Sequence, residues 1–197
     1  MSRFLLIIIY FLSVSTYAQI LPSYQATHVK KRTSSCSSSE TTMSLPNPSG
    51  GYSGNARGYY FTAPIDFCIT GVKVPTTLSS DCQSVAILKF TSGAPPAYSS
   101  STNAFDQLHY SSCVAGDNII EVDISVSQGD IIGIYGCRSN GCINSYGSNS
   151  GFGFTIGGQA VTVKRSGMQY NLKTTQMQNV WYENFSSISR VEMYYKY

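Results

Sequence analysis

Charged side chains are scarce in this 197-residue sequence, since Asp, Glu, Lys and Arg together make up 12% of it. Histidine occurs twice and tryptophan once. Four of the thirteen basic residues lie in the first 32 positions, so the rest of the chain has nine basic against ten acidic side chains and a net charge of about −1. Because no basic stripe remains, we expect neither nucleic acid nor a strongly anionic polymer as a partner.

Long hydrophobic runs are also missing after the N-terminus, where nothing approaches the roughly 20 apolar residues that a membrane span needs. The N-terminus itself has one basic residue, Arg3, then an apolar run over residues 4–12, then small and polar residues up to Ala18. This three-part layout is typical of a secretory signal peptide. We therefore predict that residues 1–18 are a signal peptide and that the protein is secreted and extracellular.

The segment that follows is rich in Ser and Thr and poor in apolar residues. Its basic run ends in the pair Lys31-Arg32, which is either a processing site that removes a propeptide, residues 19–32, or part of a solvated basic tail. We predict a flexible arm over residues 19–50 and one folded domain over residues 51–197.

Six cysteines follow the signal peptide, and an even number in an oxidising compartment predicts three disulfides. The pair Cys137 and Cys142 has no second such pair to complete a zinc site, and its spacing differs from a Cys-x-x-Cys redox motif. We predict a local Cys137–Cys142 disulfide that closes a turn around Asn140-Gly141, because Asn-Gly favours hairpin turns. The other four cysteines allow three pairings, and proximity in the sequence favours Cys68–Cys82 and Cys36–Cys113.

Helical periodicity is poor throughout the region after the arm, whereas short runs rich in Val, Ile, Tyr, Phe and Thr alternate with turn clusters such as SGAPPAYSSSTN and SQGD. In the last run, Val191, Met193 and Tyr195 alternate with polar residues, which is typical of a strand with one wet face. The pattern predicts an all-β fold: an antiparallel β-sandwich or jelly roll, stabilised by disulfides.

The segments RGYYFTAPIDFCITGVKVP, SVAILKF and VSQGDIIGIYG resemble a loose set of secreted jelly-roll modules. These modules open with a Gly-aromatic-x-Phe-Thr strand, continue with a strand ending in Ile-Thr-Gly, and later place a Gly-Asp turn before an apolar strand. The resemblance covers Gly58 to Gly136. It implies an extracellular β-sandwich that serves as an accessory or surface module, and it brings neither a catalytic residue nor the cysteines.

Catalytic patterns are weak. A Ser-His-Asp relay would have to use His109, with Asp106 or Asp130 as its orienting acid, and no Gly-x-Ser-x-Gly elbow is present. Paired carboxylates are the signature of glycosidases, but Glu121 and Asp123 share one strand face, which is the normal arrangement on the solvent side of a sheet. We therefore predict that the protein is not an enzyme.

No cofactor or metal site is predicted, although a calcium ion could bind at the turn containing Asp117 and Asn118, whose side chains offer hard oxygen ligands. One modification site is present, because Asn184-Phe185-Ser186 fits the N-glycosylation acceptor rule. We predict that Asn184 carries a glycan.

The disulfide-closed loop is the leading candidate for ligand contact. Sugars stack an apolar ring face on aromatic side chains and pair their hydroxyl groups with polar ones, and Tyr, Ser, Gly and Asn are also the adaptable contact residues of antibody loops. Trp181 is interpreted as a core anchor. The predicted ligand contacts are Arg138, Asn140, Asn144, Tyr146 and Asn149.

We therefore expect a non-catalytic structural or adhesive component of an extracellular matrix, with matrix components or glycans as partners. A soluble, lectin-like carbohydrate-binding protein is the first alternative, and a secreted hydrolase is the second. The oligomeric state is left open.

Overall fold

The computed structural model describes residues 36–148, 154–184 and 187–197, and the compact unit runs from Arg32 to Tyr197. All regular structure in these residues is β-strand, and the paired strands of each sheet run antiparallel. The strands are β1 (Thr41–Thr42), β2 (Pro48–Tyr52), β3 (Arg57–Thr62), β4 (Phe67–Lys73), β5 (Gln83–Phe90), β6 (Phe105–Val114), β7 (Ile120–Val126), β8 (Ile131–Arg138), β9 (Asn144–Ser148), β10 (Phe154–Ile156), β11 (Gln159–Val161), β12 (Lys164–Gly167), β13 (Trp181–Tyr182), β14 (Ser187–Ser189) and β15 (Glu192–Lys196).

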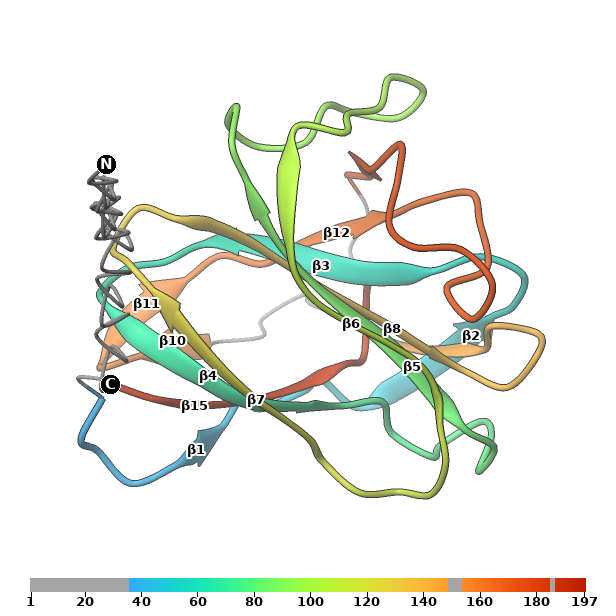
Figure 1. Ribbon diagram of the computed structural model, residues 1–197, viewed down its shortest axis with the longest axis horizontal. Coiled ribbons are helices and arrows are strands. Elements are labelled where there is room, and N and C mark those ends of the chain that lie inside the picture. The colour runs from blue at the N-terminus through green and yellow to red at the C-terminus, as the bar shows by residue number, and fades with distance from the viewer. Residues whose placement is uncertain (1–35, 149–153, 185–186) are drawn as a thin grey trace, which may run out of the picture. The chain divides into compact units, whose positions relative to one another are not determined.

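Two layers make up the sandwich (Figure 1). One is a six-stranded sheet in the order β13-β12-β3-β8-β5-β6. The other contains a four-stranded sheet, β1-β15-β4-β7, and a three-stranded sheet, β14-β9-β2, while β10 and β11 form a separate hairpin. The predicted all-β sandwich is confirmed, and jelly-roll connectivity stays a prediction.

The six-stranded sheet is buried on both faces. Its inner face packs on the four-stranded sheet through side chains such as Phe61, Ile87 and Ile134. Its outer face packs Leu88 and Tyr135 against a second cluster that includes Leu172 and Val180 from the chain after β12. This two-sided burial explains why the sequence of β5 is an almost continuous apolar run instead of an alternating one.

β15 keeps the alternation that its sequence predicts, because Met193 and Tyr195 are buried while Glu192 and Lys196 are partly exposed. It is an interior strand, paired with β1 on one side and with β4 on the other.

The three disulfides are Cys36–Cys68, Cys82–Cys113 and Cys137–Cys142. The local Cys137–Cys142 bond is confirmed, and the expected pairs Cys68–Cys82 and Cys36–Cys113 are wrong. Cys82 and Cys113 lie at the open end of the β5–β6 hairpin, where Gln83 pairs with Val114. Proximity in the sequence does not identify this pair, because antiparallel strand pairing brings Cys82 and Cys113 together across 31 positions.

Residues 36–50, which were expected to belong to a flexible arm, are part of the fold. Cys36 is bonded to β4, the side chain of Met43 is 1% exposed in the core, and β2 pairs with β9. The boundary expected at Gly51 is thus too late. The predicted signal peptide and the Lys31-Arg32 site lie outside the described residues.

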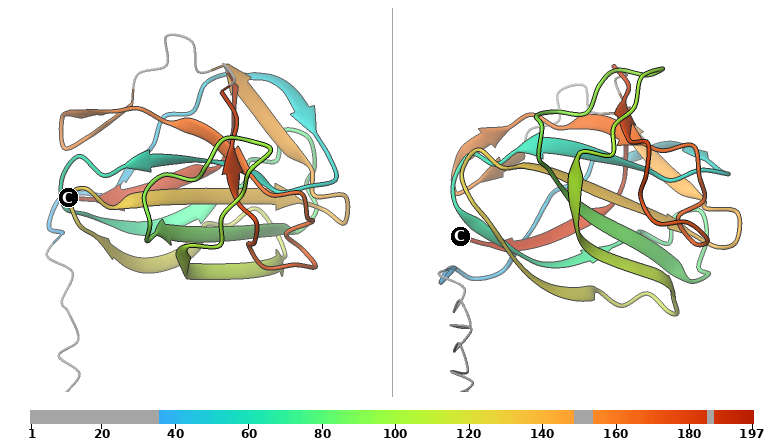
Figure 2. Two further views of the ribbon diagram at one scale, coloured as in Figure 1. Left: turned by 90° about the horizontal axis from the view of Figure 1, so that it is seen from above. Right: turned by 45° about the horizontal axis from the view of Figure 1, so that its top comes forward.

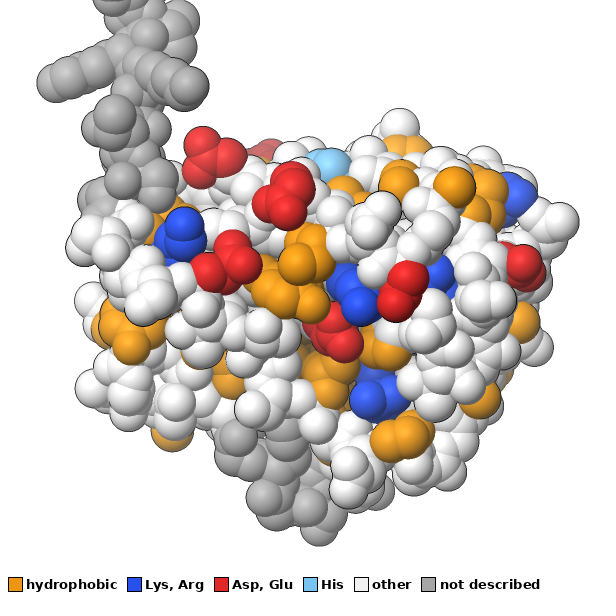
Figure 3. All heavy atoms as spheres, turned by 90° about the horizontal axis from the view of Figure 1, so that it is seen from below, with side chains coloured by type: hydrophobic (Ala, Val, Ile, Leu, Met, Phe, Trp, Pro, Cys, Tyr) orange, Lys and Arg blue, Asp and Glu red, His pale blue; other side chains and the backbone are white. Residues whose placement is uncertain are grey.

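Charges on the surface are mixed. On the face shown in Figure 3, acidic and basic side chains of the described residues lie close to one another instead of forming a broad patch of one sign. Lys73 pairs with both Asp117 and Glu192, at 3.4 and 3.9 Å, and Lys89 pairs with Asp130 at 2.8 Å.

Candidate functional site

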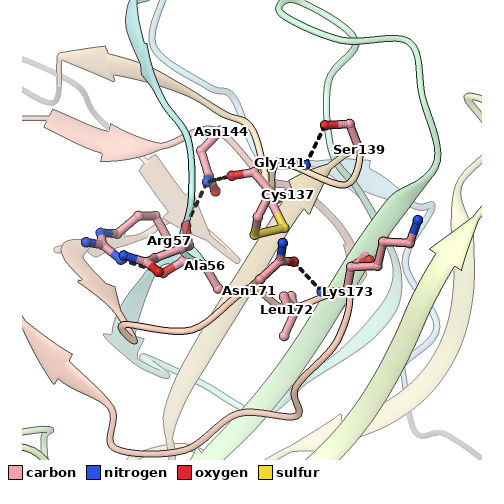
Figure 4. The surroundings of a disulfide bond; sticks show 12 residues. Ala56, Arg57, Cys137, Ser139, Gly141, Asn144, Asn171, Leu172 and Lys173 are labelled. Carbon is pink, nitrogen blue, oxygen red and sulfur yellow. Dashed lines mark hydrogen bonds between the residues drawn. A yellow bond between two sulfur atoms is a disulfide. The ribbon is translucent and has the colours of Figure 1, made fainter.

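The disulfide-closed turn is a hairpin in which Arg138 and Ile143 exchange backbone hydrogen bonds of 2.9 and 2.7 Å. The left-handed backbone conformations fall on Ser139 (φ 65°) and Cys142 (φ 46°). The turn was expected to place them on Asn140 and Gly141, because Asn-Gly tolerates positive φ most readily. Instead, the Ser139 side-chain oxygen accepts a hydrogen bond from the Gly141 N–H at 3.1 Å. The disulfide packs in the same buried cluster as Leu172 (Figure 4).

Arg138, the first predicted ligand contact, is buried with a side chain only 1% exposed. Its guanidinium joins two connections, the one between β4 and β5 and the one between β6 and β7, and it pairs with one carboxylate. It donates to the carbonyls of Val74 (2.8 Å), Asp81 (2.7 Å) and Gly116 (3.1 Å) and to Asp117 Oδ1 (2.8 Å). Burial lowers the pKa of Arg138, while Asp117 opposes that shift. Its predicted role as a ligand contact is wrong.

Asn144 is buried as well, with 1% of its surface exposed. Its amide nitrogen donates to the carbonyls of Asn55 (3.1 Å) and Cys142 (3.0 Å), and its oxygen accepts from Ser189 Oγ at 3.2 Å (Figure 4). Asn144 therefore joins β9 to its neighbours and does not face a ligand.

Asn140 is exposed at the tip of the turn, where its carbonyl accepts a 2.6 Å hydrogen bond from Asn171 and its side-chain oxygen contacts the Lys173 ammonium. Asn149 lies outside the described residues. Burial therefore gives Arg138 and Asn144 structural roles, and the exposed Asn140 stays a predicted ligand contact. Tyr146 leads to a larger cluster of unusual composition.

That cluster, here called the arginine–aromatic cluster, lies where the six-stranded sheet faces β2 and β9. The Arg165 guanidinium lies over the ring of Tyr146 at 4.4 Å and donates to its hydroxyl at 3.0 Å, and Tyr146 stacks on Tyr52 with ring centroids 6.3 Å apart. Arg165 also pairs with Glu183 at 2.8 Å. The cluster consists of Tyr52, Arg57, Tyr146, Arg165, Trp181 and Glu183.

Arg57 is the buried cation of the cluster, 3% exposed. Its guanidinium lies 4.6 Å from the ring of Tyr52 and 4.7 Å from the ring of Trp181, a geometry in which both aromatic faces stabilise the charge. It donates to the carbonyls of Ala56 (3.0 Å) and Met168 (2.7 Å). The interpretation of Trp181 as an anchor fits its 2% exposure.

A groove of about 440 Å³ adjoins the cluster and is lined by Ala97, Tyr98, Tyr182, Glu183 and Asn184. It forms where the 91–104 loop meets β13, and the two segments lie side by side in all three views (Figures 1 and 2). Tyr98 N–H donates to the Tyr182 carbonyl and Tyr182 N–H to the Pro96 carbonyl, both at 2.9 Å. These backbone hydrogen bonds hold Tyr98 and Tyr182 next to each other where the loop pairs with β13.

Tyr98 is the most exposed large apolar side chain among the described residues, at 58%. Its ring meets Trp181 edge-on with centroids 5.2 Å apart, so the cluster supports it from beneath. The groove therefore joins an exposed aromatic ring, a second tyrosine, a carboxylate and an amide. This is the mixture of apolar surface and a few polar groups that small-ligand sites use, and its volume falls within their range of roughly 300–1,000 Å³.

Electrostatics around the cluster favour neutral tyrosine. Burial raises the pKa of Tyr146, although the nearby Arg165 and Arg57 cations oppose that shift. The hydroxyl of Tyr146 thus stays protonated at neutral pH, and its oxygen accepts the hydrogen bond from Arg165.

The residues considered for catalysis are dispersed. His109 Nε2 lies 2.6 Å from Ser111 Oγ on β6, whereas Asp130 pairs with Lys89 and Asp106 is exposed. Glu121 and Asp123 are both exposed on one face of β7, as the sequence predicts.

His109 should make stability depend on pH, because burial lowers its pKa below the ordinary value of 6.5. A lowered pKa means that the folded state favours the neutral ring. The neutral ring's contribution to folding stability is therefore fully present above pH 6.5, and it is lost as the pH falls from there through the pKa of the folded state. We expect the urea midpoint of the wild type to fall more between pH 7.5 and 5.5 than that of His109→Gln. Parallel pH dependence in the two proteins would contradict a partly buried, neutral His109.

The proposed calcium ligand Asp117 is already engaged by two cations. One of its oxygens accepts from Arg138 at 2.8 Å and the other lies 3.4 Å from Lys73. A metal ion at this turn would have to compete with both side chains.

Comparison with models of known protein families, with curated proteins and with solved structures gives no significant match. In the part of the chain that the structure describes, no helix has the length and apolar character needed to cross a membrane. Fold and site therefore define the class directly: a disulfide-bonded, all-β domain with an aromatic groove at one end of its six-stranded sheet.

Sequence reasoning missed the groove. Tyr98 lies in the segment SGAPPAYSSSTN, which was interpreted only as a turn cluster, and Tyr182 lies beside Trp181 in a two-residue strand. An aromatic residue inside a long polar loop was the available signal, because long loops without regular structure often carry binding residues.

Proposed function

We propose that this protein is a secreted, non-catalytic, adhesive component of an extracellular matrix that binds glycan chains through the Tyr98–Tyr182 groove. The observation that carries the proposal is the groove itself, in which an exposed tyrosine ring is fixed by backbone hydrogen bonds beside a carboxylate and an amide. Three disulfides hold the fold, which suits an oxidising compartment outside the cell.

Carbohydrate is the ligand class that this chemistry fits. A pyranose ring presents an apolar face of C–H groups, which can lie on Tyr98 or Tyr182, and hydroxyl groups, which can pair with Glu183 and Asn184. Glu183 is held by Arg165, so its carboxylate is oriented before a ligand arrives. Pre-orientation of this kind lowers the entropic cost of binding.

Replacing Tyr98 with alanine should therefore weaken glycan binding at least tenfold, because exposed aromatic anchors dominate such interfaces. The measurement is binding of the purified domain, with Asn184 unmodified, to an array of immobilised oligosaccharides. Tyr197→Ala is the matched control: Tyr197 is 47% exposed, and it lies at the C-terminus, away from the 91–104 loop (Figure 1). Equal binding by both variants, or no binding by the wild type, would contradict a glycan site in this groove.

A soluble lectin would use the same groove, so a second measurement separates it from a matrix component. Sequential extraction of the source tissue, followed by mass spectrometry, shows where the protein resides. Recovery only after denaturant or demineralisation supports the matrix component, and recovery in plain buffer supports the lectin.

A further inference from the structure

We propose that the groove is the seat of the chain's own N-glycan: the first sugar attached to Asn184 lies in it, against Tyr182 and Tyr98. The proposal starts from the acceptor. Asn184 is exposed, heads the sequence Asn184-Phe185-Ser186, and is itself one of the residues that line the groove. A sugar bonded to its amide nitrogen begins at the wall of the groove, so the first ring has a site within reach of its own linkage.

The tyrosines are placed to receive that ring. Tyr182 precedes Asn184 by two positions and lines the same groove, and Tyr98 lies next to Tyr182, held by the 2.9 Å hydrogen bond from its N–H to the Tyr182 carbonyl. The first sugar of an N-glycan is N-acetylglucosamine, which offers an apolar ring face and an acetamide methyl to the two rings. A groove of about 440 Å³ falls within the range, roughly 300–1,000 Å³, of sites that take small ligands.

The linkage itself favours this seat over solvent. A sugar tethered at the edge of the groove has an effective concentration on the order of millimolar, so a contact with a dissociation constant in the same range already fills about half of the sites. The polar groups agree with this arrangement, because Glu183 can accept a hydrogen bond from a sugar hydroxyl while it remains paired with Arg165 at 2.8 Å.

A regulatory consequence follows, and this part rests on the proposed function. The attached sugar and an external glycan chain compete for the same tyrosines, so a chain glycosylated at Asn184 is occupied by its own sugar and binds external glycans weakly. The unmodified chain has the open groove. Occupancy of the acceptor site then sets what fraction of the protein is adhesive.

The seat is tested by a thermal-stability cycle on protein from cells that attach N-glycans, with glycan occupancy at Asn184 measured by mass spectrometry. The glycosylated protein is compared with Ser186→Ala, which removes the acceptor motif and keeps the groove residues. We expect glycosylation to raise the Tm by about 2–4 °C in the wild type and in the Tyr197→Ala control. In Tyr98→Ala the gain should shrink by at least half, and trimming the glycan to its first N-acetylglucosamine should leave the wild-type gain intact.

An equal gain in all three backgrounds, a gain that disappears on trimming, or an unmodified Asn184 overturns the seat. Binding to immobilised chito-oligosaccharide is then measured for the glycosylated protein and for Ser186→Ala. At least tenfold tighter binding by Ser186→Ala supports competition between the two sugars, and equal binding by both overturns it. If neither protein binds any oligosaccharide while the stability cycle shows the expected coupling, the seat stands and the proposed adhesive function fails.

Discussion

Replacing Arg138 with alanine is expected to lower the free energy of unfolding by about 3–5 kcal/mol, because the change removes four hydrogen bonds made by a buried charged group and leaves the buried Val74 carbonyl without this partner. Its guanidinium makes four hydrogen bonds, to the carbonyls of Val74, Asp81 and Gly116 and to the Asp117 carboxylate, and only 1% of the side chain is exposed. Without it, the β4–β5 and β6–β7 connections lose their common partner. Reversible urea unfolding of the two proteins measures the difference.

The control isolates the ion pair from the backbone contacts. Asp117 is 52% exposed, so Asp117→Asn removes only a screened charge and should cost no more than about 1 kcal/mol. A small loss of unfolding free energy in both variants would show that Arg138 does not hold these connections together. A loss of glycan binding in Arg138→Ala without a loss of stability would instead restore it as a ligand contact.

Removing the Cys36–Cys68 disulfide with Cys36→Ala and Cys68→Ala is expected to cost about 3–4 kcal/mol, from the chain entropy released by opening a loop of this length. The two cysteines lie 32 positions apart. The bond also anchors the segment that carries Met43 into the core and β1 onto β15, so we expect proteases to cut near residues 36–43 in the variant. Urea unfolding and mapping of the cleavage sites measure both effects.

The matched control is the local disulfide, whose cysteines are five positions apart. The same entropic argument gives only about 2 kcal/mol for Cys137→Ala with Cys142→Ala, and cleavage near residues 36–43 should not change. If the two double variants lose equal stability, or the first stays resistant near its N-terminus, the anchoring role of Cys36–Cys68 is wrong.

Strands with a buried face could be predicted from the sequence, because apolar periodicity is a local signal. β5 and β8 are continuous apolar runs and β15 alternates, and all three form where expected. β2 and β9 were missed because their sequences, PSGGY and NSYGS, carry no such pattern. They are strands because they pair with each other across about ninety positions, and no local pattern encodes that pairing.

Two of the predicted ligand contacts, Arg138 and Asn144, are wrong for a related reason. Arg138 and Asn144 are polar residues in a polar stretch, and their burial is set by acceptors that distant segments supply. Tyr98 meets Trp181 only after the 91–104 loop has folded over β13. The Cys82–Cys113 bond, by contrast, could have been predicted from the sequence. The two strands that flank this loop form a hairpin, and both cysteines lie at its open end.

That hairpin gives the domain the properties of a display scaffold. Its base is locked covalently by Cys82–Cys113, its two strands are fixed in register, and its tip is the loop that carries Tyr98. Because the loop is joined to β13 by backbone hydrogen bonds, its exposed side chains can change without disturbing the sheet beneath it. New specificities could therefore arise by exchange of residues 91–104 alone, with the remainder of the fold kept as a constant frame.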